Sequence, residues 1–428
     1  MRPTRTEACT PWAIALAALL SQLGGCSAEE GQDTIRVGRC LEGYTCVPRS
    51  NAPPEPTPGP PAEDPGEPPP PEPTAPVPPD AKLRELDYRV VDAAYDAPTG
   101  EVVVVSDEPQ ELIVVAPDGL GERRYPLPDK PVTVGVSADG RLAGIGYATG
   151  VAVLEIATGA PVATCAAPTN VKHVAITNAG RVFALSSVED ADVHRLTALD
   201  SSTCSVLAEV GADSHSVFAL TRSERTLFLL NGLFMRCLVQ PASGTRGLES
   251  CDRTRVSDSC GGFWLERGET ELYTQCATRY RLPSESDPAH PELRGGQFPD
   301  IDRVDMVTAS AASNRVAVLG FMQVSGVAAP LGTRILRIYD SVFLDPLAAL
   351  GLPPLPTATG TTASYGRFVF ADAAMKTALV FVRAAPGSSA RREFGLALVP
   401  IPEDTVAPDA GSLDSGSPDS ASPEAGVR

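Results

Sequence analysis

The fold of this chain is decided by the stretch Val132-Thr-Val-Gly-Val-Ser-Ala-Asp-Gly-Arg-Leu-Ala-Gly-Ile-Gly-Tyr-Ala-Thr-Gly-Val-Ala-Val-Leu-Glu-Ile-Ala-Thr-Gly-Ala-Pro-Val-Ala-Thr-Cys165. Apolar and β-branched residues alternate with small residues, and turn signals stand at Asp139-Gly140 and Thr158-Gly159. Asp-Gly between two alternating apolar runs predicts a hairpin, because the positive φ angles of a type I′ turn suit glycine. The stretch therefore predicts four short strands joined by tight turns.

The same unit recurs along residues 82–401. Its copies open at Tyr88–Ser106, Val132–Tyr147, His173–Ser186, Val217–Leu230, Gly262–Gln275, Val304–Gly320 and Phe368–Val382. All but the last of these starts lie about 40–50 residues apart, which is the period of propeller blades, and the last two are 64 residues apart. Blades set around an axis leave few sheet edges exposed. The sequence therefore predicts an all-β propeller with seven four-stranded blades. Six or eight blades, or two stacked β-sandwiches, are the alternatives.

Two segments of the deciding stretch resemble the YVTN family of β-propellers. Ser137-Ala-Asp-Gly-Arg-Leu142 is similar to that family's Ser-Pro-Asp-Gly signature, and Val153-Leu-Glu-Ile-Ala-Thr-Gly159 to its Val-Ile-Asp-x-x-Thr-Gly signature. The resemblance is clearest over residues 132–210. The Tyr-Val-Thr-Asn element is absent, and Ile145-Gly-Tyr-Ala148 stands near its place. The Gly-His and Trp-Asp marks of WD40 repeats are absent too, so the period supports the fold more than the motifs do.

Closure of the ring needs one strand from the other end of the domain. The last copy offers three strands, around residues 367–371, 377–383 and 393–400. We expect Lys82–Leu86 to supply the missing outermost strand, because an open blade edge invites aggregation.

The N-terminus resembles a bacterial lipoprotein signal. Arg2 and Arg5 precede the apolar segment 11–20, whose ten residues span about 15 Å as a helix and are too short to cross a membrane. Leu23-Gly-Gly-Cys26 then resembles the lipobox, which implies that Cys26 is lipidated. A plain secretory signal with a chance cysteine is the alternative. Ser27 in place of Asp implies, by resemblance to sorting rules, the outer membrane of the cell envelope.

A proline-rich stretch separates the predicted anchor from the propeller. Residues 53–79 hold 15 prolines, which exclude helix and sheet and predict an extended spacer of about 80 Å. The predicted segments are signal peptide 1–25, anchor segment 26–50, linker 51–80, propeller 81–402 and tail 403–428. The tail has an acidic residue at every fifth position, and its composition predicts disorder.

Eight of the ten cysteines remain once Cys9 is removed with the signal and Cys26 is lipidated. An even number in an oxidising compartment predicts disulfides. The repeat positions suggest the pairs Cys40–Cys46, Cys165–Cys204, Cys237–Cys251 and Cys260–Cys276. No Cys-x-x-Cys or Cys/His cluster occurs, so we expect neither a metal site nor another cofactor.

The net charge and the histidines limit the classes of partner and of site that the sequence supports. The formal charge of −18 disfavours nucleic acid and anionic lipid surfaces as partners. His173 and His215 each stand where an inner strand is expected to begin, at one end of the channel, which makes them candidate ligand contacts. Comparable positions in other copies are Asp87, Lys130, Asp302 and Tyr365. Ordinary rim residues with solvent partners are the simpler interpretation.

The sequence offers no catalytic motif. Gly-x-Ser-x-Gly is absent, and the mature chain has one tryptophan, Trp264, against the repeated tryptophans of quinone-cofactor propellers. We therefore expect a lipid-anchored binding or scaffold module for a protein or glycan rather than an enzyme, with no catalytic residues assigned. The alternative is a propeller-fold hydrolase or lactonase with its site at the channel mouth.

Overall fold

The computed structural model describes residues 75–119, 121–188, 193–231, 234–239, 249–255, 261–265, 269, 271–282, 293–310, 312–321 and 332–403. Within these ranges every regular element is a β-strand. No helix there is long and apolar enough to cross a membrane. The predictions for the signal peptide, Cys26, Cys40–Cys46, residues 51–74 and the tail beyond 403 lie outside the described residues.

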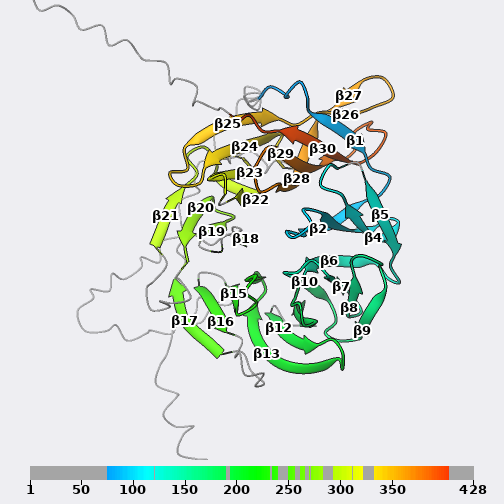
Figure 1. The fold of residues 1–428 in the computed structure, drawn as a ribbon, viewed down its shortest axis with the longest axis vertical. Helices are drawn as coiled ribbons and strands as arrows, with labels where there is room; N and C mark the ends of the chain where they lie inside the picture. The colour runs from blue at the N-terminus through cyan, green and yellow to red at the C-terminus, as the bar shows by residue number, and fades with distance from the viewer. Residues whose placement is uncertain are drawn as a thin grey trace, which may run out of the picture. The chain divides into compact units, whose positions relative to one another are not determined.

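Six four-stranded sheets are each built from consecutive strands and follow one another around a ring (Figure 1). Blade I holds β2 (Val90–Tyr95), β3 (Val102–Asp107), β4 (Gln110–Val115) and β5 (Glu122–Pro126). Blade II holds β6 (Pro131–Val136), β7 (Leu142–Tyr147), β8 (Val151–Glu155) and β9 (Pro161–Cys165). Blade III holds β10 (Val171–Ile176), β11 (Arg181–Ser187), β12 (Val193–Asp200) and β13 (Ser205–Asp213).

The other three blades follow the same order. Blade IV holds β14 (Val217–Leu220), β15 (Thr226–Asn231), β16 (Phe234–Val239) and β17 (Glu249–Arg255). Blade V holds β18 (Phe263–Leu265), β19 (Glu271–Thr274), β20 (Thr278–Arg281) and β21 (Leu293–Gln297). Blade VI holds β22 (Arg303–Ser310), β23 (Arg315–Phe321), β24 (Ile335–Asp340) and β25 (Pro346–Gly351).

A further four-stranded sheet closes the ring and is composite. It joins β28 (Ser364–Ala371), β29 (Thr377–Ala384) and β30 (Phe394–Pro400) to β1 (Lys82–Glu85) from the other end of the domain. β1 pairs antiparallel with β30, from Lys82 opposite Leu398 to Glu85 opposite Gly395. The predicted propeller fold and the predicted N-terminal closure are therefore confirmed. A short hairpin of β26 (Leu355–Pro356) and β27 (Thr361–Thr362) was not predicted.

Blade II follows the predicted strands closely, but its first turn differs in type. The Gly140 N–H donates to the Ser137 carbonyl over 2.9 Å, and Gly140 has a φ of 73°. Asp139 has no positive φ, so the expected type I′ turn is wrong. The chain makes a longer turn that ends on a left-handed glycine, which is another common hairpin connection.

Apolar clusters between neighbouring sheets hold the ring together. Val103 and Val105 of blade I pack with Ala143 and Ile145 of blade II, and all four are buried. Both faces of β3 are buried, which explains its unbroken run of apolar residues. Burial of each such large side chain contributes roughly 1.5–3 kcal/mol.

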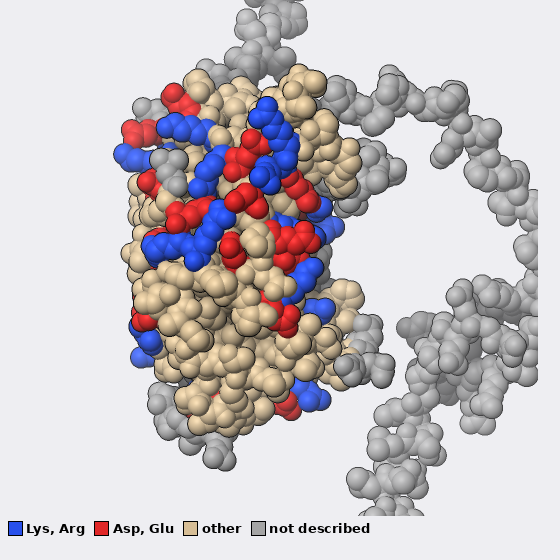
Figure 2. All heavy atoms as spheres, turned by 90° about the vertical axis from the view of Figure 1, so that its right-hand side faces the viewer, with Lys and Arg blue, Asp and Glu red and all other residues tan. Residues whose placement is uncertain are grey.

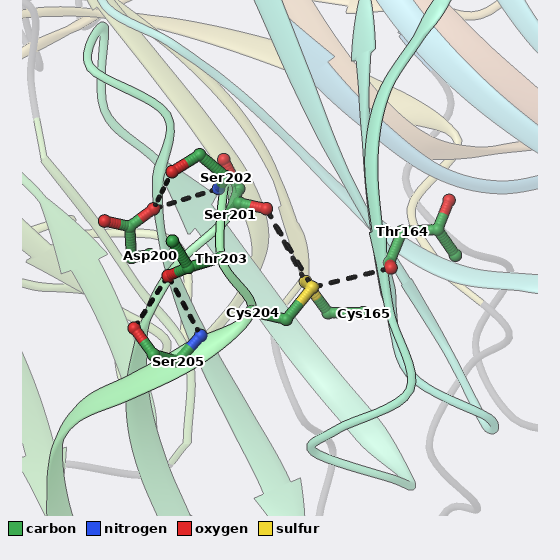
Figure 3. The surroundings of a disulfide bond; sticks show 8 residues. All are labelled: Thr164, Cys165, Asp200, Ser201, Ser202, Thr203, Cys204 and Ser205. Atoms are coloured by element: carbon green, nitrogen blue, oxygen red, sulfur yellow. Dashed lines mark hydrogen bonds between the residues drawn. A yellow bond between two sulfur atoms is a disulfide. The ribbon is translucent and has the colours of Figure 1, made fainter.

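A disulfide cross-links blades II and III. Cys165 at the end of β9 bonds Cys204 in the turn between β12 and β13, with the Cα atoms 5.4 Å apart (Figure 3). The predicted pair is confirmed. Cys276 is also disulfide-bonded, while its predicted partner Cys260 and the side chains of Cys237 and Cys251 lie outside the described residues.

Ion pairs tie the closing strand to blade I. Arg84 of β1 contacts Glu122 of β5, and Arg124 of β5 contacts Asp87 just after β1 at 2.7 Å. The Asp87–Arg124 hydrogen bond is the largest cause of a lowered pKa for Asp87. Figure 2 shows the face at the right of Figure 1, where charged side chains of both signs gather in the upper part. The N-terminal strand is thus fixed at its edge by charges as well as by its pairing with β30.

Hydrogen bonds run from blade to blade at the turns that follow the innermost strands. The Asp139 N–H of blade II donates to Asn178 Oδ1 of blade III over 2.9 Å, and the Asn178 N–H donates to Glu224 Oε1 of blade IV over 2.6 Å. The Arg222 N–H of blade IV in turn donates to Glu269 of blade V. We call this end of the innermost strands the turn end.

Candidate functional site

The opposite end of the innermost strands surrounds a cavity of about 540 Å³. Its polar and charged wall is formed by residues of blades I, III and VI and the closing sheet: Asp92, Lys172, His173, Asp305, Tyr365, Arg367 and Arg383. Val91 and Val132 add apolar surface. The cavity lies where the innermost strands begin, which is the end of the channel that the sequence predicted for a ligand site.

A repeated β-bulge decides which residues face this cavity. In five innermost strands one residue is skipped in the pairing with the second strand, and the skipped residues are Val91, Val132, Lys172, Asp305 and Arg367. All five line the cavity. A bulge re-aims a side chain out of the alternating pattern of a strand. We call these five the bulge residues, and their end of the strands the bulge end.

Blades IV and V lack this feature in their described pairs. β14 pairs with β15, and β18 with β19, without a shift of register. Neither blade contributes a residue to the cavity wall. The site is therefore one-sided, built by the closing sheet and blades I, II, III and VI.

Asp305 is the carboxyl group of the cavity without a hydrogen-bond partner. Its Oδ2 atom is buried and meets no donor in the described structure. Burial raises the pKa of Asp305 from its usual 3.8 to about 6, and Arg303 opposes the rise. Asp305 also lines the cavity, so a ligand there can approach its carboxyl group.

Arg367 is a half-buried cation of the cavity. It donates from Nη2 to the Val91 carbonyl over 3.0 Å, and its guanidinium lies 5.4 Å from the centre of the Phe368 ring. Burial is the largest cause of a lowered pKa for Arg367, and the nearby Arg383 lowers it further. Two guanidinium groups therefore face one cavity and repel each other.

Asp92, by contrast, is already satisfied. Its Oδ2 accepts bonds from Thr133 Oγ1 at 2.8 Å and the Val134 N–H at 3.0 Å, and its Oδ1 accepts one from the Ala93 N–H at 2.9 Å. These bonds join blade I to blade II. We assign Asp92 to the framework of the site rather than to its free binding groups.

His173 reaches the cavity, as predicted, but from inside β10 rather than before it. His173 is exposed to solvent, and it lies among the residues that line the cavity. Burial within that wall is the largest cause of a lowered pKa for His173, opposed by Asp92 and assisted by His194. The neutral ring can donate or accept one hydrogen bond to a ligand.

Of the other predicted channel positions, one lines the cavity and the rest do not. Tyr365 lines the cavity. His215 is not among the lining residues. It is exposed before β14, and its Nδ1 lies 3.1 Å from Ser214 Oγ. Lys130 pairs with Asp107 at 2.9 Å, Asp87 with Arg124, and Asp302 also lies away from the wall.

The predicted positions lie before the innermost strands, whereas the bulge residues lie within them, from the second residue of β2, β6 and β10 to the fourth of β28. Each bulge residue follows a buried strand residue, such as Val90 before Val91 or Val171 before Lys172. Positions 91, 132 and 172 recur at nearly equal spacing in the sequence. That spacing was the available signal, although it does not by itself mark a bulge.

The described residues include no group of three or more His, Cys, Asp or Glu side chains that could hold a metal ion. The wall provides mixed charge, hydrogen-bonding groups and some apolar surface. Such a wall can bind and orient a small polar molecule.

Comparison with known proteins supports the fold. No family model matches the chain, and no characterised protein matches it in sequence. The β-propeller domain of Cps50 (Swd1) from Myceliophteria thermophila is similar in structure, with a TM-score of 0.54 and 12% identity over 75% of this chain and 100% of that one. The structure of U3-55K gives a TM-score of 0.51 and 10% identity, covering 76% of this chain and 100% of that one.

The RRP9 WD40 repeats are similar too, with a TM-score of 0.50 and 10% identity over 77% of this chain and 99% of theirs. At such low identity the likeness concerns the fold alone. The chain is therefore a β-propeller by its fold. Its own repeats and the cavity at the bulge end are the features from which a function can be argued.

Proposed function

We propose that this chain is an exported, lipid-anchored β-propeller that binds a ligand in the channel cavity and performs no chemistry on it. The observation that carries the binding role is the one-sided wall of bulge residues. It places Asp305, whose Oδ2 has no partner, and the half-buried Arg367 around about 540 Å³ of space. Polar groups buried without partners destabilise a fold, so their presence points to a ligand that satisfies them.

A glycan fits this cavity better than a folded protein does. The volume suits a small molecule or the end of a chain, and the charged wall lies inside the channel rather than on a broad outer surface. The net charge of −18 disfavours nucleic acid. We therefore favour the glycan over the protein partner.

A glycan array tests this binding role. The full chain with Cys26→Ser, secreted without an anchor, would be applied to bacterial envelope saccharides beside a second form that also carries Arg367→Gln. We expect binding that the Arg367 change removes. Absence of binding, or equal binding by both forms, would contradict the proposal.

The anchor rests on the Leu23-Gly-Gly-Cys26 resemblance and needs its own test. Cells expressing the native chain or Cys26→Ser would be given labelled palmitate and then fractionated. We expect label and membrane association with the native chain alone. Equal labelling of the two forms would refute lipidation at Cys26.

The raised pKa of Asp305 is a reason to test the hydrolase alternative. A carboxyl group with a pKa of about 6, such as Asp305, is suited to donate a proton near neutral pH. Saccharides bound on the array would therefore also be checked by mass spectrometry for shorter products. Product formation that Asp305→Asn abolishes would replace the binding proposal with a catalytic one.

A further inference from the structure

The cavity has two poles of different chemistry. At the basic pole, Arg367 uses one of its five N–H donors on the Val91 carbonyl, and Arg383 uses Nε on Glu393 at 2.7 Å. Most of the donors on the two guanidinium groups have no protein acceptor in the described structure. Guanidinium forks match the two oxygens of a carboxylate, and an anion between them relieves their repulsion.

At the acidic pole, Gly332 lies beside Asp305. Gly332 has a φ of 139°, and a Cβ atom placed on it would lie 3.1 Å from the Gly366 carbonyl oxygen and in ordinary contact, at 3.9 Å, with Asp305 Oδ2. Asp305 itself lines the cavity, so a donor on a ligand can approach its carboxyl group there.

The two poles do not neutralise each other. The causes of the raised pKa of Asp305 are burial and the opposing charge of Arg303, and the acids that act on Arg367 are Asp92 and Glu393. Asp305 and the guanidinium pair therefore remain separate binding groups on one wall. A ligand that satisfies both must carry an anion at one end and a hydrogen-bond donor at the other.

We propose that the cavity binds a small organic acid, with its carboxylate held by Arg367 and Arg383 and a hydroxyl or ammonium group of the same molecule donating to Asp305. This inference rests on the proposed binding function and names its ligand class. Two sources share the required chemistry: a sugar acid, whose hydroxyls are the donors, and an amino acid, whose ammonium is the donor. Lys172 and His173 lie on the same wall and add donors for the carboxylate.

Titration calorimetry at pH 7 on the full Cys26→Ser chain tests the inference with four probes. Glucuronic acid carries a carboxylate and hydroxyls, and alanine carries a carboxylate and an ammonium. Propionic acid has the carboxylate alone, and glucose has the hydroxyls alone. We expect glucuronic acid or alanine to bind at least about tenfold more tightly than both single-feature probes, and which of the two binds identifies the source.

Variants locate the binding. Arg367→Gln and Arg383→Gln should each weaken the favoured probe about tenfold or more, and Asp305→Ala should remove its advantage over propionic acid. Arg123→Gln on the outer strand β5 is the matched control, and it should leave binding unchanged. Two arginine variants are used so that a folding defect in one, detected by its unfolding midpoint, leaves the other informative.

The outcomes separate this inference from the binding function. Glucose binding as tightly as glucuronic acid would overturn the organic acid and leave the glycan-binding role standing. Propionic acid binding as tightly as the two-feature probes would overturn the role of Asp305. If no probe binds while the glycan array is positive, the organic acid is wrong. If the array is negative as well, the proposed function fails with it.

Discussion

The two ends of the innermost strands use their polar groups in opposite ways. At the turn end, Asn178 and Glu224 accept backbone N–H bonds from the preceding blade over 2.9 and 2.6 Å. At the bulge end, Asp305 has no partner for Oδ2, and Arg367 makes a single hydrogen bond. Asn178 and Glu224 at the turn end thus have hydrogen-bond partners from the neighbouring blade, whereas Asp305 Oδ2 at the bulge end has none.

This difference separates stability from function within one repeated unit. Satisfied hydrogen bonds between blades stabilise the ring, whereas a buried group without a partner costs stability. A protein retains such a costly group where a ligand uses it. The comparison predicts that substitutions at the turn end lower stability and that substitutions at the bulge end lower binding.

The largest effect on stability is expected at the disulfide between blades II and III, which joins the end of β9 to the turn between β12 and β13. Its 39-residue separation corresponds to about 4 kcal/mol in the chain-entropy account of cross-links. The paired change Cys165→Ser with Cys204→Ser should lower the free energy of unfolding by about that amount, measured by urea denaturation. The double change avoids a free thiol.

Adding Asn178→Ala to the double serine variant tests how far the hydrogen bonds between blades II and III stabilise the ring when the disulfide is absent. We expect a further loss. A loss below about 1 kcal/mol for the two serine changes would show that the cross-link does not stabilise the ring.

The second effect is an increase in the free energy of unfolding from a substitution at the bulge end, and its size depends on pH. Because the folded state raises the pKa of Asp305 from 3.8 to about 6, the native chain holds this proton more tightly than the unfolded chain. Stability is therefore lost as pH rises from about 4 through 6. Asp305→Asn removes this penalty and should raise the free energy of unfolding by up to about 3 kcal/mol at pH 8.

At pH 4 the same substitution should change stability little, since Asp305 is then largely protonated in the folded chain. Asp302→Asn, at an exposed acid just before β22, is the control for the loss of one acidic side chain. Urea denaturation at the two pH values measures the difference. A loss of stability at pH 8 for Asp305→Asn would contradict the comparison, because it would give Asp305 a structural role.

The third effect compares the two ends of one strand. Asn178→Ala, just after β10, removes the acceptor of the Asp139 N–H and should cost about 1 kcal/mol. Lys172→Gln, at the bulge of β10, should change stability by less than about 0.5 kcal/mol. The two unfolding midpoints in urea provide the measurement. Equal losses at both positions would remove the distinction between the ends.

Much of the fold was predictable because it depends on local pattern. The alternation in Val132–Cys165 predicted the four strands of blade II, and the position of Gly140 predicted its first turn. The type of that turn was wrong, because Asp-Gly fits several hairpin connections and pairing selects among them. The Cys165–Cys204 pair followed from equivalent positions in neighbouring copies.

The candidate site was only partly predictable. His173 and Tyr365 reach the cavity, but His215 does not, because the described pairs of β14 contain no bulge. Lys172, Asp305 and Arg367 were missed altogether. A bulge is a shift in how two strands pair, and the sequence of one strand does not show it.

The strand content, the repeat, the closing strand and the disulfide between two copies are readable in the amino-acid sequence, since they depend on periodicity and on equivalent positions. The tertiary structure alone decided which residue of each innermost strand faces the channel and which charges remain without partners. Those properties arise where several sheets meet, so they depend on residues far apart in the chain. The cavity at the bulge end is the result, and it carries the proposed function.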